Sequence, residues 1–143
     1  MATTTFLSNA TINITQGATS YDLSDQGNQC TLTIGQDSLE ITAFGDTGHK
    51  FAGGLQSVDV SITFFLSYGT GEVEAALAAM VGQGSTTLVI SPSGTTEGPS
   101  NPEYTIQNAM LSSFTPINST VGEIATVTAN WTGGTWARDI TAP

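Results

Sequence analysis

Apolar and polar residues alternate with a period of two in several short segments of this 143-residue chain. The clearest is the segment 58–64, VDVSITF, in which aliphatic and aromatic residues occupy every second position. Successive side chains of a strand point to opposite faces, so this segment predicts a strand with one buried and one polar face. Shorter segments of the same kind give seven or more expected strands, separated by glycine and proline. Such a series predicts a β-sandwich or a barrel-like fold.

One segment has helical spacing instead. Between Thr70 and Gly82 the apolar residues recur every three or four positions, with alanines between them. Thr70 is the expected N-cap, and Gly82 is expected to close the C-terminus. We therefore predict a mainly β fold with one flanking α-helix at about Thr70–Gly82.

The connections between strands suggest where the chain turns. The polar residues Gly35–Ser38 separate the alternating runs 30–34 and 39–43, which predicts a β-hairpin. Two longer connections are expected at 44–54, which holds aromatic residues and the only histidine, and at 91–102, rich in Ser, Gly and Pro. Long loops in a small domain are often functional, so the first predicts an interaction loop and the second a flexible surface loop.

Composition limits the function classes. The net charge is −10, and only Lys50 and Arg138 are basic. Because tight nucleic-acid binding needs many cationic phosphate contacts, a DNA-gripping surface is excluded. The N-terminus has no basic segment followed by an apolar run, so we expect no secretory signal, and no stretch is long enough for a membrane span. We expect one domain over residues 1–143.

Catalytic chemistry has few candidate residues. His49 is the only imidazole, and the only cysteine, Cys30, occupies an inward strand position where a thiol acts as a small apolar side chain. No G-x-S-x-G elbow is present, and Asp22 with Asp25 is too sparse for a calcium loop. We predict no enzyme, no cofactor and no metal site. A hydrolase centred on His49 is the least favoured alternative.

Aromatic residues leave one alternative of a different class. Tyr21, Trp131 and Trp136 could line the groove of a glycan-binding β-sandwich. This hypothesis requires both tryptophans to face solvent.

Several short motifs occur in an order that resembles a known family. The motifs are Asp22-Leu23-Ser24, the stretch Thr42–Leu55, Asn101–Tyr104, the turn Ser113–Ile117 and the step Val121–Glu123. In order and spacing they resemble the major tail tube proteins of long-tailed bacteriophages, especially those that infect actinobacteria. The resemblance covers roughly residues 20–140.

The resemblance implies a β-sandwich subunit with a flanking helix that assembles into hexameric rings. In that family the subunits contribute strands to a continuous inner barrel, and the rings stack into a tube through which the genome passes. The implied partners are further copies of the chain, a tape measure protein and tail terminator or completion proteins. Double-stranded DNA would pass the lumen without specific binding, and the protein would be a virion component assembled in the bacterial host cytoplasm.

The same resemblance suggests which segments join subunits, without identifying the acids that face the lumen. An N-terminal arm, Met1–Asn9, and the loop 44–54 are expected to reach between rings. The candidate contact residues are Phe44, Asp46, His49, Lys50 and Phe51. An acidic tube wall fits independently, because six copies would carry on the order of −60 charges. A capsid decoration protein, or another small acidic β-domain of the virion, is the nearest alternative.

Overall fold

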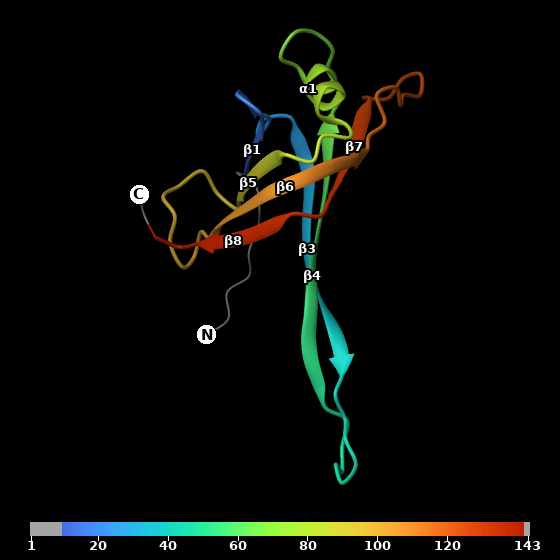
Figure 1. Cartoon of the computed structure of the whole chain (residues 1–143). Helices are drawn as coiled ribbons and strands as arrows, with labels where there is room; N and C mark the ends of the chain where they lie inside the picture. The colour runs from blue at the N-terminus through green and yellow to red at the C-terminus, as the bar shows by residue number, and fades with distance from the viewer. Residues whose placement is uncertain (1–9, 142–143) are drawn as a thin grey trace.

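The computed structural model describes residues 10–141, so the expected arm Met1–Asn9 lies outside the described residues (Figure 1). The fold is mainly β with a single short helix, as predicted, and within this range no helix is long and apolar enough to cross a membrane. The elements in chain order are β1 (Thr11–Gln16), β2 (Thr19–Asp22), β3 (Gly27–Glu40), β4 (Phe51–Phe65), α1 (Val73–Met80), β5 (Thr86–Ser91), β6 (Glu103–Ser113), β7 (Thr126–Thr132) and β8 (Thr135–Asp139).

All paired strands are antiparallel, and β6 joins two parts of one sheet. The strand order is β2-β1-β5-β6-β7-β4-β3, and β8 pairs with β6 beside this path. The first part of β6 pairs with β5 and β8, whereas Met110–Ser113 pair with β7. The change of partner follows Asn108, whose φ of 62° is in the left-handed region. Such an irregularity bends a strand, and β6 and β8 run across β3 and β4 in Figure 1.

The hydrophobic core lies between the two parts of the sheet and α1. The alternating segment of β4 is inward as predicted, with Val58, Val60, Ile62 and Phe64 at most 2% exposed. Buried residues of the paired strand β7 lie beside them, β1, β5 and β6 contribute further buried residues, and α1 adds four more. The helical contribution is Val73, Ala76, Leu77 and Met80. Burying a large aliphatic side chain contributes about 1.5–3 kcal/mol, so α1 is held to the sheet by its apolar face.

The predicted helix exists but is shorter than expected. It spans Val73–Met80 and not Thr70–Gly82, and Glu72 rather than Thr70 occupies the N-cap position, without a side-chain capping bond. Ser67 supplies the missing cap, because its hydroxyl accepts a hydrogen bond from the Val73 amide at 3.3 Å. Positive φ angles at Gly69 and Gly71 keep the preceding residues out of the helix.

The predicted hairpin of segments 30–34 and 39–43 is wrong. Gly35–Ser38 does not turn but lies inside β3, which pairs with β4 along its length apart from irregularities at 27–29 and 36–38. The expected loop 44–54 is correspondingly too long, because β4 begins at Phe51. The hairpin is therefore formed by β3 and β4, with a tip at residues 41–50.

The segment 91–102 is organised around a buried side chain. Asn101 is 5% exposed, and its amide Nδ2 donates to the Thr95 carbonyl at 2.8 Å. Its Oδ1 accepts from the Ser93 amide at 3.1 Å. The side chain of Asn101 thus satisfies backbone groups of this segment beyond the two backbone hydrogen bonds between Gly98 and Asn101.

Replacing Asn101 by alanine is expected to lower the free energy of unfolding by about 1–3 kcal/mol, because backbone groups lose their buried partners. Urea denaturation measures the change. Thr96→Ala, an exposed site in the same segment, is the control and should stay within about 0.5 kcal/mol of the wild type. Equal stability of both variants would contradict this role of Asn101.

Candidate inter-subunit surfaces

The β3–β4 hairpin projects from the body of the molecule (Figure 1). We call residues 35–57 the distal hairpin, since β7 pairs with β4 only from Asp59 onward. Beyond that point, within the part of the chain that the structure describes, the two strands pair only with each other. Large apolar side chains of the distal hairpin are exposed, including Leu39 at 56% and Leu55 at 81%.

The distal hairpin is expected to be only marginally stable in an isolated subunit. A two-stranded hairpin is marginally stable in water, and exposed apolar clusters mark interaction surfaces. Its backbone edges are also open, and β3 is the last strand of the sheet. Gln56 anchors its base by accepting a hydrogen bond from Trp136 Nε1 at 3.0 Å. The distal hairpin is therefore the first candidate interaction surface.

Polar side chains fold the tip of this hairpin. Glu40 lies 2.5 Å from His49 Nδ1 and accepts a hydrogen bond from the Thr42 hydroxyl at 2.9 Å. Lys50 Nζ pairs with Asp46 at 2.8 Å, and Asp46 also accepts the amide of Ala43 at 2.7 Å. The hydrogen bond from His49 and that from Thr42 lower the pKa of Glu40. Lys50 and the Ala43 amide likewise lower the pKa of Asp46.

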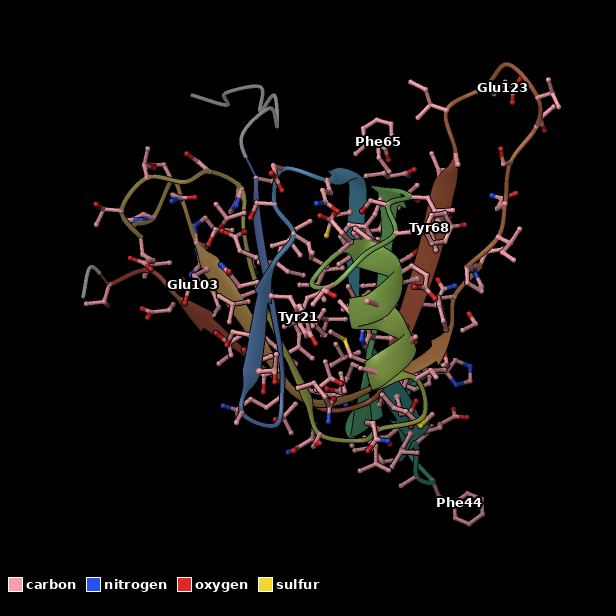
Figure 2. All side chains as sticks on the ribbon, turned by 90° about the horizontal axis from the view of Figure 1, so that it is seen from above. Tyr21, Phe44, Phe65, Tyr68, Glu103 and Glu123 are labelled. Atoms are coloured by element: carbon pink, nitrogen blue, oxygen red, sulfur yellow. The ribbon has the colours of Figure 1, made fainter. Side chains whose placement is uncertain are left out.

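The structure divides the predicted contact residues into two kinds. Asp46, His49 and Lys50 bond within the tip and give it a fixed shape. Phe44 and Phe51 are exposed, and Phe44, fully exposed, stands at the extremity of the molecule (Figure 2). The Phe51 ring lies 6.4 Å from that of His49. The phenylalanines are thus the residues of this set that offer apolar contact area.

Acidification is expected to loosen the tip. The pKa values of Glu40 and Asp46 are lowered in the folded chain, so their ionised forms stabilise the tip above the ordinary carboxyl range. That contribution is lost as the pH falls through the lowered pKa values. NMR relaxation of the amides of Ala43 and Lys50 should show greater mobility at about pH 3 than at about pH 7, while Ile62 in β4 stays rigid. Unchanged tip mobility at the lower pH would contradict this.

A second surface is the outer face of β3, β4, β7 and the end of β6. Cross-strand pairs place serine, threonine, asparagine and glutamine side chains together on this face, opposite the core. Two exposed apolar side chains lie at its borders, Met110 opposite Thr132 and Phe65 opposite Thr126. We call this surface the polar wall; its members are Gln29, Thr31, Thr33, Ser57, Asp59, Ser61, Thr63, Ser113, Thr128, Asn130 and Thr132.

Two hydrogen-bonded pairs join side chains of the polar wall. The hydroxyls of Thr63 and Thr128 are 3.3 Å apart, and Asn130 Nδ2 donates to the Ser113 hydroxyl at 3.1 Å. Asp59 is the one charged member, and its side chain is exposed. The polar wall therefore carries one carboxylate and no cationic side chain that would attract an anion.

A third surface lies at the end of the molecule opposite the hairpin tip. The segment 114–125 lies there beside α1 (Figure 1), and Phe65 and Tyr68 lie on the same side (Figure 2). The Tyr68 hydroxyl donates to the Pro116 carbonyl at 2.8 Å and fixes this segment. We call the exposed apolar residues here the upper apolar group; they are Phe65, Tyr68, Ile117, Val121 and Ile124.

The candidate catalytic residues do not form a site. Burial raises the pKa of the Cys30 thiol to about 11, so it is protonated near neutral pH and is a poor nucleophile. His49 is hydrogen-bonded to Glu40 at the exposed tip. Within residues 10–141 no group of His, Cys, Asp and Glu side chains is placed to hold a metal ion.

The two tryptophans do not form a glycan platform. Trp131 is 1% exposed and belongs to the core, which is inconsistent with the solvent-facing position that this alternative requires. Trp136 is half-buried against Tyr104, with ring centroids 6.3 Å apart. The alternation of Val127, Ala129 and Trp131 is the sequence signal that would have placed this tryptophan in the core. The alternating positions between the buried residues of β4 and β7 are polar, and this pattern would have predicted the polar wall.

No protein-family profile matches the chain, and no curated protein matches it in sequence. Solved structures match its fold. The SPP1 tail tube protein is 9% identical with a TM-score of 0.70, covering 94% of this chain and 78% of that one. The tube-terminating cap of the anti-feeding prophage is 14% identical with a TM-score of 0.65, covering 99% and 95%. A tail protein of the gene transfer agent, from a helical reconstruction with C6 symmetry, is 10% identical with a TM-score of 0.58, covering 92% and 95%. The chain therefore has a tail-tube-like fold.

Proposed function

We propose that this protein is the structural subunit of a tail tube of a bacteriophage or phage-like particle. It polymerises as stacked hexameric rings around a channel for genome delivery. The distal hairpin carries this proposal, because its exposed apolar residues and open edges have no partner among residues 10–141 of the same subunit. The shared fold with the SPP1 tail tube and the C6 symmetry of the gene transfer agent tail support a six-fold tube.

Ring formation uses the open edges of the sheet. β3 and β2 are its end strands. Unpaired strand edges are a liability for a monomer but a means of assembly when another copy pairs with them. Contacts between different surfaces of identical subunits close into a ring when the rotation permits. Lateral pairing through β3 extends the β3-β4-β7 sheet from one subunit to the next.

Stacking uses the two ends of the molecule. The hairpin tip lies at one end of the molecule, and α1 with the segment 114–125 lies at the other (Figure 1). The exposed Phe44 and Phe51 belong to the first end, and the upper apolar group belongs to the second. Contact between them is heterologous and repeats from ring to ring. The polar contacts of Asp46, His49 and Lys50 hold the tip in one conformation before the rings meet. Less conformational entropy is therefore lost when the rings associate.

The polar wall faces the channel. Six copies place a ring of Asp59 carboxylates in each layer, on subunits that each carry a net charge of −10. Negative charge repels DNA phosphates, and the polar wall offers no cation to retain them. Double-stranded DNA then moves through the channel without specific binding.

The proposed role sets the partners and the location. The partners are further copies of this chain, a tape measure protein and tail terminator or completion proteins. The protein is a virion component assembled in the cytoplasm of the bacterial host. It acts as a structural protein, without a cofactor and without an enzymatic step.

Negative-stain electron microscopy of the concentrated protein tests the proposal. Hollow tubes, or six-fold rings with a central channel, are the expected particles. Trimeric clusters would contradict the tube and favour a capsid decoration protein.

A further inference from the structure

The sheet pairing alone does not fix the direction in which the distal hairpin leaves the body. From Asp59 onward β4 lies between β3 and β7, but within residues 10–141 the distal hairpin has no third strand. The register of its two strands is also irregular close to this point, between Gln36 and Ser38. Register irregularities bend strands, and a two-stranded ribbon resists bending less than a wider sheet. A further contact with the body is therefore required to hold one direction.

One polar contact joins this part of the hairpin to the body. Gln56 pairs with Gln36 and precedes Ser57 of the polar wall, so its side chain leaves the sheet on the opposite face. On that face its Oε1 accepts a hydrogen bond from Trp136 Nε1 at 3.0 Å. Among residues 10–141 this is the one hydrogen bond between the distal hairpin and the rest of the subunit.

The donor of this bond is itself held firmly. Trp136 lies in β8 opposite Ile106 of β6, and its half-buried ring lies against Tyr104. β8 starts next to Gly134, which approaches β6 so closely that an added Cβ would collide with the Gln107 carbonyl oxygen. The indole N–H is therefore a fixed point on the body, to which the base of the hairpin is attached.

The length of the hairpin magnifies any change of direction at its base. Phe44 is eight positions beyond Gln36, at most about 27 Å along an extended strand. A rotation of about 10° at the base would displace the tip by about 5 Å, roughly the spacing of neighbouring strands. Apolar side chains are in contact only within about 4.5 Å, so such a displacement removes a contact made by the Phe44 ring.

We infer that the hydrogen bond between Trp136 and Gln56 sets the direction in which the distal hairpin leaves the body. Gln56 and Trp136 are positioning residues, which act on the contact of Phe44 without belonging to it. The direction of the hairpin is a property of the single subunit. Only its consequence for stacking rests on the proposed function.

Residual dipolar couplings of the backbone amides, measured by NMR on the dilute, monomeric full chain, test the inference. In the wild type the couplings of the distal hairpin and of residues 58–64 should fit one alignment. Gln56→Ala removes the acceptor, so the population of misdirected hairpins should rise roughly 2- to 12-fold and reduce the hairpin couplings alone. Gln56→Glu keeps an acceptor oxygen and should retain the wild-type couplings. Gln83→Ala, at an exposed glutamine outside the sheet, is the control.

The donor gives an independent test. Trp136→Phe keeps a ring against Tyr104 but removes the indole N–H, so it should reduce the hairpin couplings as Gln56→Ala does. Because both variants remove the same bond, the double variant should add nothing further. The Trp136 indole proton should exchange with solvent roughly 2- to 12-fold faster in Gln56→Ala, while that of the buried Trp131 should not change. Equal hairpin couplings in the wild type and both single variants, or additive losses in the double variant, would overturn the inference.

Assembly measures what the direction of the hairpin contributes to stacking. Gln56→Ala should raise the critical concentration for tube formation by up to about 12-fold, because fewer subunits present Phe44 in the productive direction. Gln56→Glu and Gln83→Ala should assemble as the wild type does. An unchanged critical concentration in Gln56→Ala would overturn the link to stacking. Absence of tubes from the wild type would instead contradict the proposed function, and the couplings of the monomer would still decide the inference.

Discussion

Replacing the hairpin tip is expected to abolish tube formation while leaving a folded subunit. In this variant an Asn-Gly type I′ turn connects Ile41 directly to Lys50, whose carbonyl accepts the Ile41 amide at 2.9 Å in the native hairpin. The core contains no residue of the tip, so the subunit should keep its thermal stability. Stacking loses the apolar contact of Phe44 in every subunit. Electron microscopy and sedimentation should then show no tubes at concentrations where the wild type assembles.

The point variant Phe44→Ser gives a graded version of the same test. Loss of one buried phenylalanine per added subunit removes about 1.5–3 kcal/mol. The critical concentration for assembly should therefore rise roughly 10- to 150-fold. Thr47→Ser, at an exposed position of the same tip, is the control and should assemble as the wild type does. Normal tubes from both the tip replacement and Phe44→Ser would exclude stacking through this tip.

Reversing the charge of the channel wall is expected to turn a channel that repels DNA into one that retains it. Asp59→Lys replaces six carboxylates per ring by six ammonium groups, each close to the path of the DNA. Cationic phosphate contacts give affinity that falls steeply with salt. Assembled Asp59→Lys tubes should co-sediment with a short DNA duplex at about 50 mM salt, release it at about 200 mM and protect it from nuclease. Wild-type tubes should not retain the duplex.

Two control variants distinguish the effect of a positive charge on the polar wall from the effect of a change in the net charge of the subunit. Asp25→Lys changes the net charge by the same amount at an exposed residue outside the polar wall, and it should not protect DNA from nuclease. Asp59→Asn should assemble without retaining DNA, which shows that the carboxylate is not required for folding. Equal nuclease protection by Asp25→Lys and Asp59→Lys would contradict the assignment of the polar wall to the lumen.

Elements with a buried face were predictable from the sequence. The segment 58–64 alternates because its apolar residues enter the core, and α1 has helical spacing because its apolar face packs on the sheet. The distal hairpin has no buried face within the subunit. Its strand segment Gly35–Ser38 therefore lacks alternation and has the composition of a turn, which explains the wrong hairpin prediction.

The candidate surfaces were predictable only in part. Aromatic residues in the segment 44–54 indicated an interaction site, but composition could not distinguish Phe44, which is exposed, from Asp46 and His49, which bond within the tip. The role of Asn101 has no periodic signal, because a single buried amide organises a segment without alternation. The upper apolar group depends on chain segments that are brought together only by the fold.

The central claim is that the polar wall faces the channel of a six-fold tube. A helical cryo-electron microscopy reconstruction of the assembled protein tests it most directly. We expect six subunits per ring, Asp59 on the channel surface, and Phe44 of each subunit against the upper apolar group of the adjoining ring. Another face of the sheet on the channel, or rings of a different symmetry, would contradict the account.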